Sequence, residues 1–228
     1  MIGLYVSVPI ACFRPGAARE FWESLPLPPP STIYGFLLSF VGETDRTRHL
    51  GVRCTCGTIG EPFRSSVLRR MWRIKELGGA SNATQGNGSN VRPDYQQLLS
   101  NVRLVIWIDS SEEEVLKESL ETRIKTALSP SKRGSIERFG GLSLGESTHL
   151  VDEVSLIERM DVDANNEKVQ LFVVRDRGRF TLSVWVDHVG SAGTRYANGD
   201  LVVRDAIVPP NVEELPKICS TSRLEHSL

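Results

Sequence analysis

The sequence has no excess of charge of either sign: its 228 residues hold 27 lysines and arginines against 28 aspartates and glutamates. This balance excludes a globally basic nucleic-acid binder and a polyacidic tail protein, but it permits a basic face on one side. Cysteine is scarce too, with four residues, and a chain of this length buries enough surface to fold without a disulfide framework. The composition is that of an ordinary globular protein, with one large domain or one domain and a small appendage.

Signals for a metal site and for a membrane are missing as well. No second pair of cysteines or histidines follows Cys54 and Cys56 at zinc-finger spacing. Residues two apart in a strand point the same way, so the pair favours two buried thiols on one strand face over a metal site. No apolar run approaches the ~20 residues of a membrane span, and the first residues lack the features of a signal peptide. We expect a cytoplasmic protein with reduced thiols, no cofactor, no metal and no membrane contact.

What the sequence does contain is a succession of strand and helix patterns. Alternating and β-branched apolar residues indicate strands at residues 2–8, 50–58, 101–109, 151–158, 168–174, 179–187 and 201–208. The strands at 168–174 and 179–187 are expected to pair as a hairpin. The order is β-α-β, an insertion, β-α-β and a β-rich C-terminal part, and its first part has the split βαβ order of ferredoxin-like α+β folds.

Two segments have the apolar periodicity of amphipathic helices. After three consecutive prolines, Ser31 or Thr32 is expected to cap a helix that ends near Gly42. A second helix is predicted over residues 111–128, with Ser111 at its N-cap in a capping box. The strand and helix patterns together predict a mixed α+β fold.

The most unusual segment is an insertion between the second and third strands. Residues 46–75 hold eight basic residues and one acidic residue, with the aromatic Trp72 among them. Residues 78–90 are only small or polar, so they are expected to form a flexible tip that packs no core. Basic groups around an aromatic residue suit single-stranded RNA, because they neutralise phosphates and stack on unpaired bases. The alternative is a solvated basic edge with Trp72 anchored in the core.

A glycine-rich segment at residues 140–147 is a second candidate for phosphate contact. Its glycines let the backbone approach a ligand closely and point N–H groups at a phosphate. Basic residues precede it at Lys132, Arg133 and Arg138. It has neither the P-loop nor the dinucleotide-binding pattern. The alternative is a tight loop around two buried leucines.

Metal-independent RNA cleavage needs a general base and a general acid, and the histidines are candidates. His49 follows the first helix, where Tyr34 and nearby basic residues would assist it. His149 lies between Ser147 and Asp152, which permits a Ser/His/Asp triad, although such a cluster is more typical of a hydrogen-bonded turn. A repeat endoribonuclease therefore stays open as an alternative, and no residue is assigned a catalytic role.

Two segments resemble one protein family. Residues 25–43, which contain Pro-Pro-Ser-Thr-Ile-Tyr-Gly, and residues 138–152, which begin Arg-Phe-Gly-Gly-Leu-Ser-Leu-Gly-Glu-Ser, are similar to the CRISPR-associated family-five (DevS-like) proteins. These belong to the repeat-associated mysterious protein superfamily. The resemblance implies a modified ferredoxin-like palm at residues 1–63 and 101–228, with a long inserted β-hairpin thumb at residues 64–100.

The resemblance also implies a role. Family members of this kind work in a type I Cascade, the crRNA-guided surveillance complex. There they cap the 5′ handle of the guide, join the backbone subunits to the large subunit, and lie near target DNA at the first kink of the guide–target duplex. Some members cleave repeat RNA with a Tyr, Lys and His group, but this chain has no adjacent Lys-His pair. We expect a non-catalytic RNA-binding subunit, with a protein-interaction module without RNA as a further alternative.

The residues expected to contact RNA fall into three groups. Phosphate contacts are assigned to Arg14, Arg64, Arg69, Arg70, Arg73, Lys75, Lys132 and Arg138, and base stacking is assigned to Trp72 and Phe139. The glycine-rich cradle comprises Gly140, Gly141, Ser143, Gly145, Glu146 and Ser147. Tyr34 is expected either to brace the handle or to serve the core.

Overall fold

The computed structural model describes residues 1–15, 21–72, 91–114, 117–138, 140–159, 167–189 and 191–220, with the backbone alone at 70–72, 91–92, 133 and 159. The strands are β1 (Ile2–Ala11), β2 (Phe21–Trp22), β3 (Arg53–Ile59), β4 (Phe63–Trp72), β5 (Val91–Asp109), β6 (Glu153–Leu156), β7 (Lys168–Val174), β8 (Phe180–Trp185) and β9 (Arg195–Asp205). The α-helices are α1 (Pro30–Phe40) and α2 (Leu120–Leu128). This mixed architecture agrees with the α+β class expected from the sequence.

The nine strands within these parts of the chain form one mostly antiparallel sheet in the order β6-β1-β5-β3-β7-β9-β8, and β2 and β4 also pair with β5. The C-terminal half of β5 lies between β1 and β3, and both pairs are antiparallel. β6 pairs antiparallel with the other edge of β1. The leucines, isoleucines and valines that alternate along β1 and β5 are buried, which is why their sequence pattern located these strands.

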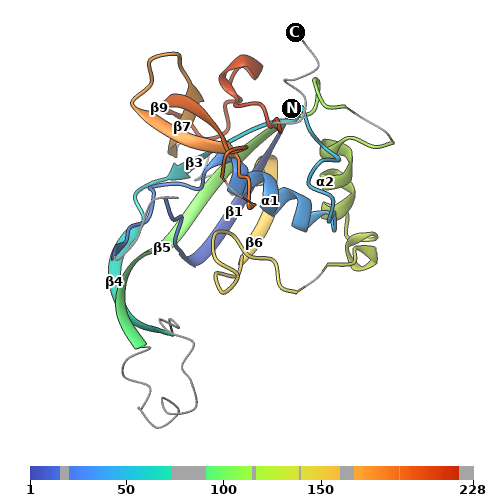
Figure 1. The fold of residues 1–228 in the computed structure, drawn as a ribbon. Coiled ribbons are helices and arrows are strands. Elements are labelled where there is room, and N and C mark those ends of the chain that lie inside the picture. Colours follow the sequence, from blue (N-terminus) through green and yellow to red (C-terminus); the bar gives the residue numbers. More distant parts are fainter. Residues whose placement is uncertain are drawn as a thin grey trace.

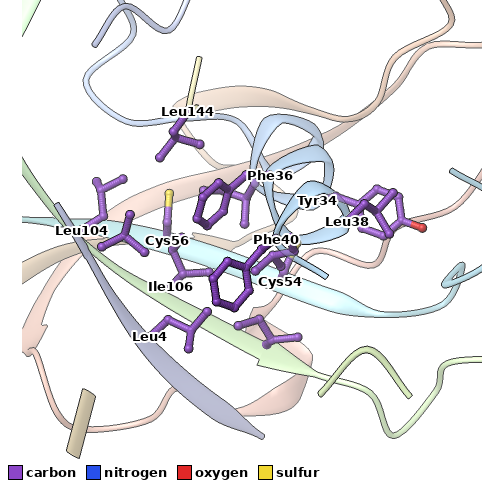
Figure 2. Close-up of a cluster of buried hydrophobic side chains, with 14 of the residues drawn as sticks. Leu4, Tyr34, Phe36, Leu38, Phe40, Cys54, Cys56, Leu104, Ile106 and Leu144 are labelled. Carbon is purple, nitrogen blue, oxygen red and sulfur yellow. The ribbon is translucent and has the colours of Figure 1, made fainter. Parts of the chain in front are cut away.

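Both α-helices lie on one face of the sheet, and their apolar sides join a common core with β1, β3 and β5 (Figure 1). Figure 2 shows Phe36 and Phe40 of α1 above the sheet, with Phe40 beside Leu4 and Ile106. The periodic apolar positions of the helix sequence are therefore the positions that are buried. Neither of the described α-helices is long and apolar enough to cross a membrane.

The thiols of Cys54 and Cys56 on β3 share one buried face, as their spacing predicts. Their Sγ atoms lie 3.8 Å and 3.3 Å from the carbonyl oxygens of Pro30 and Pro28. Burial raises the pKa of Cys54 to about 12, so the thiol stays protonated and acts as a small apolar group in the core. Across the described ranges, no cluster of three or more His, Cys, Asp or Glu side chains is arranged to hold a metal ion.

The start of α1 differs from the predicted serine or threonine cap. The helix begins at Pro30 behind Pro29, without a side-chain cap. Proline suits the first helical position because it lacks an N–H and already has a helical φ. The hydroxyl of Ser31 lies instead 2.7 Å from the hydroxyl of Ser183 on β8. The predicted end is confirmed, because Gly42 takes a φ of 69° directly after the last turn.

α2 begins at Leu120, so the predicted N-cap at Ser111 is wrong. The N-cap is Ser119, whose hydroxyl accepts the N–H of Thr122 at 3.2 Å. The preceding turn places the carboxylate of Glu113 at the helix start, where it accepts the N–H of Leu120 at 2.9 Å. A buried contact between distant segments thus overrides the local capping pattern.

Glu113 belongs to a buried charge network that ties α1 to α2. Its Oε1 lies 2.5 Å from Nδ1 of His49, whose side chain is 1% exposed. Arg123 on α2 donates to Nε2 of His49 at 2.8 Å, so the proton of that ring lies on Nδ1 and is donated to Glu113. Arg123 also pairs with Glu43. Burial alone would raise the pKa of Glu43, but a backbone N–H and Arg123 outweigh it and lower the pKa to about 2.

Acid is expected to weaken the fold through Glu43. Its pKa is lower in the folded protein than in the unfolded chain, so the ionised carboxylate stabilises the fold above about pH 4.5, and this stabilisation is lost as the pH falls toward 2. The shift corresponds to about 3 kcal/mol in the free energy of unfolding. Urea unfolding should therefore give a difference between wild type and Glu43→Gln that shrinks from about pH 7 to about pH 3. A difference that stays constant over that range would contradict this role.

The C-terminal strands contradict the predicted hairpin between residues 168–174 and 179–187. β7 and β8 form, but β9 lies between them and pairs antiparallel with both. The turn after β7 crosses β9 at Gly199, which is opposite Val174 on one side and Phe180 on the other. A β-carbon at Gly199 would clash with the backbone of β7, so glycine is what permits the crossing. The sequence pattern located these strands but not their neighbours.

β4 and the N-terminal half of β5 form a hairpin that extends away from the body of the protein (Figure 1). Its register runs from Phe63 opposite Ser100 to Trp72 opposite Val91, and we call the stretch from the Phe63–Ser100 pair to the Arg69–Asp94 pair the root. β5 continues from the hairpin into the central sheet, so the projection and the body share one strand. The predicted flexible tip at residues 78–90 lies outside the described residues.

Candidate nucleic-acid interface

Three polar side chains from separate elements converge on one carboxylate in the glycine-rich loop. Glu146 accepts hydrogen bonds from Nη1 of Arg69 on β4 at 3.1 Å and from Nε2 of Gln96 on β5 at 2.8 Å. Nε of Arg14, which follows β1, lies 3.4 Å from the same carboxylate. These contacts tie the loop to the root of the hairpin, and they bring together predicted site residues from three distant segments.

The strand register explains why these side chains face the loop. Successive residues of a strand point to opposite faces, whereas residues directly opposite each other share a face. Arg69 lies opposite Asp94, and Gln96 is two residues further along β5, so these side chains share one face. Trp22 on β2 lies opposite Gln96 and joins that face. The root therefore directs an arginine, an amide and an indole toward the glycine-rich loop.

Arg14, Arg69, Trp22 and Glu146 line a depression of about 610 Å³, which we call the first hollow. The guanidinium of Arg14 lies 4.3 Å from the centre of the Trp22 ring, in a cation–π contact. The side chains of Arg14 and Arg69 are 45% and 35% exposed, so both remain open to solvent although Glu146 partly neutralises them. Ser147 and Thr148 complete this part of the wall.

A second hollow of about 450 Å³ lies between α1, β8 and the same loop. Thr32 and Gly145 line both hollows, so the hollows adjoin at these two residues, which we call the ridge. In the second hollow the guanidinium of Arg46 lies 4.3 Å from the centre of the Trp185 ring and donates to the Val186 carbonyl at 2.8 Å. Each hollow therefore contains an arginine stacked on a tryptophan.

The ridge depends on a glycine. Gly145 has a φ of 94°, and a β-carbon there would lie 2.7 Å from the carbonyl oxygen of Cys12. The neighbouring Leu144 is buried, and its N–H bonds to the His149 carbonyl at 3.0 Å. The segment is thus a tight turn around a buried leucine, and its outer residues also line the hollows.

Two of the predicted RNA contacts serve the body of the protein. Tyr34 is buried, and its hydroxyl donates to the Arg46 carbonyl at 2.8 Å. Burial also raises the pKa of Tyr34, so of the two roles considered for this residue the geometry favours the core. Arg138 donates through Nε and Nη2 to the Phe40 carbonyl, at 3.0 Å and 2.6 Å, and holds the end of α1.

The other predicted residues are distributed more widely. Arg64, Lys132, Gly140 and Gly141 are exposed, and Ser143 lines the second hollow. The structure describes only the backbone of Arg70 and Trp72, whereas Arg73, Lys75 and Phe139 lie outside the described residues. The first hollow therefore unites Arg14, Arg69, Gly145, Glu146 and Ser147 out of the predicted set.

Sequence reasoning missed both tryptophan stacks. Trp22 and Trp185 have no local pattern that distinguishes a wall of a hollow from an ordinary core residue. Arg46 belongs to the basic stretch, but its partner Trp185 comes from the far end of the chain. Only the folded sheet brings these residues together.

The two histidines considered for catalysis are buried. Both ring nitrogens of His49 are engaged, one by Glu113 and one by Arg123. Nδ1 of His149 accepts the N–H of Cys12 at 3.2 Å, whereas a Ser/His/Asp triad needs that nitrogen to donate to a carboxylate. Burial also lowers the pKa of His149, which keeps the ring neutral. This geometry does not match the general-base arrangements considered from the sequence.

The chain is similar to known proteins in sequence and in fold, although no protein-family model matches it. A CRISPR-associated protein Cas5 from Myxococcus xanthus is 47% identical over 218 residues, which cover 96% of this chain and 97% of that protein. A chain of a CRISPR RNA-guided surveillance complex has a TM-score of 0.58 at 14% identity, with 92% of each chain covered. A crystal structure of a Cas protein has a TM-score of 0.51 at 13% identity, with 95% of this chain and 97% of that chain covered. At these identities the two structures bear on the fold alone.

Proposed function

We propose that this chain, which belongs to the Cas5 family of CRISPR-associated proteins, is a non-catalytic RNA-binding subunit of a type I Cascade that caps the 5′ handle of the crRNA. The observation that carries the proposal is the first hollow, where Arg14 and Arg69 face the glycine-rich loop at the root of the hairpin. Guanidinium groups and closely approaching backbone N–H groups are the donors that phosphates prefer.

The arrangement of the central strands supports a ferredoxin-like palm. β6, β1, β5 and β3 are adjacent in that order, every neighbouring pair is antiparallel, and the chain order is β1-α1-β3-β5-α2-β6. We assign residues 1–63 and 101–228 to the palm with its β-rich C-terminal part, and residues 64–100 to an inserted thumb. The β4–β5 hairpin forms the base of that thumb.

The guide then follows the thumb into the first hollow. Arg64, Arg70, Arg73 and Lys75 belong to the thumb, and Lys132 belongs to the palm. Trp72 and Phe139 remain the proposed stacking residues. Tyr34 and Arg138 act indirectly in this scheme, because they hold α1 and the loop after it.

We further assign the partners that such a subunit needs. The thumb extends away from the palm, so it is able to reach beyond the handle toward target DNA near the first kink of the guide–target duplex. Backbone subunits and the large subunit of the Cascade are the proposed protein partners, in antiviral defence or another RNA-guided targeting process.

Repeat RNA distinguishes the proposed role from its alternatives. We expect the purified chain to bind this RNA with a log affinity that falls with log salt at a slope of about −1.4 or steeper, because at least two phosphates are contacted. We also expect no cleavage when EDTA is present. Cleavage in EDTA that disappears in His49→Ala would favour the endoribonuclease. Binding that does not respond to salt, or no binding, would favour a protein-interaction module.

A further inference from the structure

We infer that the two hollows are a pair of nucleobase subsites, which hold two unstacked bases splayed to opposite sides of the ridge formed by Thr32 and Gly145. This inference rests on the proposed function, since it names what the RNA places at the same surface. It assigns roles to Arg46, Trp22 and Trp185, which the proposed phosphate contacts leave unused.

The first support is the repeated arginine–tryptophan stack. In each hollow the Cζ atom of an arginine lies over an indole ring, 4.3 Å from its centre. Arg14 and Arg46 also line the hollows, so a ligand that enters either hollow can contact the arginine there. Unpaired RNA bases stack on guanidinium planes as well as on aromatic rings. An arginine held over a tryptophan ring is therefore suited to carry one base.

The edges of a base also find partners in both hollows. Glu146 and Thr148 line the first hollow, and Ser31 and Ser39 line the second. Carboxylate and hydroxyl oxygens accept hydrogen bonds from base amino groups, and hydroxyls also donate to base carbonyls. The volumes of about 610 Å³ and 450 Å³ leave room for a nucleotide in each.

The second support is a glycine inside α1. Gly35 is exposed and lines the second hollow, and apart from its chain neighbours and its own helix backbone no atom of the described residues lies within 4 Å of the place where a β-carbon would be. Glycine is the weakest helix former after proline, and no close contact with the described residues accounts for it at this position. The absence of a side chain keeps the second hollow open beside the helix backbone, which is what a ligand pressed against α1 needs.

The ridge gives the reason for two subsites rather than one. Thr32 and Gly145 lie between the stacks, so a strand that crosses the ridge must direct successive bases to either side. Gly145 also lets the loop backbone approach the chain crossing it. The nitrogens of the Arg14 guanidinium other than Nε, which contacts Glu146, would donate to a phosphate while its face stacks on a base.

The test is a scan of abasic positions through a repeat RNA oligonucleotide, with affinity measured for the full-length chain. We expect two positions whose loss weakens binding roughly tenfold each. Lysine keeps the charge of arginine but lacks the flat face, so Arg46→Lys should weaken binding of the intact RNA about as much as one of these abasic positions. Arg46→Lys should cause no further loss of affinity for an RNA that already lacks the base at that position. Arg14→Lys should behave in the same way toward the other abasic position.

Two further variants separate a failed subsite from a failed fold. Gly35→Leu fills the second hollow and should remove the effect of the same abasic position as Arg46→Lys, while its melting temperature stays equal or rises because leucine favours helix. Arg179→Lys, on an exposed arginine paired with Asp200, is the matched control and should leave affinity unchanged. If binding depends on salt but no single abasic position weakens it, the subsites are overturned and the proposed function stands. The same conclusion follows if the losses of affinity do not couple to the Arg14 and Arg46 variants. Absence of any RNA binding overturns both.

Discussion

Reversing Arg14 and Arg69 together to glutamate is expected to weaken RNA binding by about a hundredfold or more. Each arginine in the wild type is able to make a charge-assisted contact with a phosphate, and such contacts contribute about 1.5–3 kcal/mol each. In the double variant two carboxylates join Glu146 in the first hollow, so phosphate repulsion adds to the lost attraction. Filter binding at fixed salt, and RNA co-purification with the assembled complex, both measure this effect.

The control for this variant must change the net charge equally. Lys168→Glu with Arg179→Glu does so at the start of β7 and just before β8, at side chains that are 64% and 81% exposed and form ion pairs outside the hollows. Surface pairs of this kind contribute little to stability, so the control should fold and retain RNA. If both double variants lose RNA equally, the effect is one of overall charge, and the first hollow is not the contact surface.

Local sequence patterns were sufficient for much of the sheet. β1 and the C-terminal half of β5 have long alternating apolar runs, and burial of one face is what such alternation reports. The same reasoning placed Cys54 and Cys56 on one buried face. It failed for the pairing of β7 and β8, because a strand pattern does not specify which strand lies beside it. The deciding residue there is Gly199, which comes after both strands in the sequence.

For the candidate interface, too, sequence patterns located the segments but not their contacts. The basic segment and the glycine-rich segment were visible as sequences, and the structure brings Arg69 and Glu146 into contact. Their mutual pairing was not predictable, because it depends on the hairpin root facing the loop. The glycine-rich cradle was expected to act through its backbone, yet the Glu146 side chain organises the first hollow.

Glu113→Ala is expected to cost about 3–5 kcal/mol in the free energy of unfolding, a large part of the stability of a typical domain. The carboxylate is buried, and it accepts hydrogen bonds from both the His49 ring and the first N–H of α2. Burial alone would raise the pKa of Glu113, but those hydrogen bonds outweigh it and lower the pKa, so the group is ionised at neutral pH. Its removal leaves buried donors without an acceptor and weakens the link between α1 and α2.

Comparison with the adjacent residue makes this prediction specific. Glu114 is exposed, so Glu114→Ala should cost less than about 1 kcal/mol. If a capping box at Ser111 were correct, the larger loss would instead belong to Glu114, because its side chain would be the one that reaches back to the cap. Urea unfolding of the two variants decides between these arrangements. Glu113→Gln should fall between them, since an amide keeps one acceptor oxygen for the His49 ring or the Leu120 N–H but lacks the charge and the second acceptor oxygen of the carboxylate.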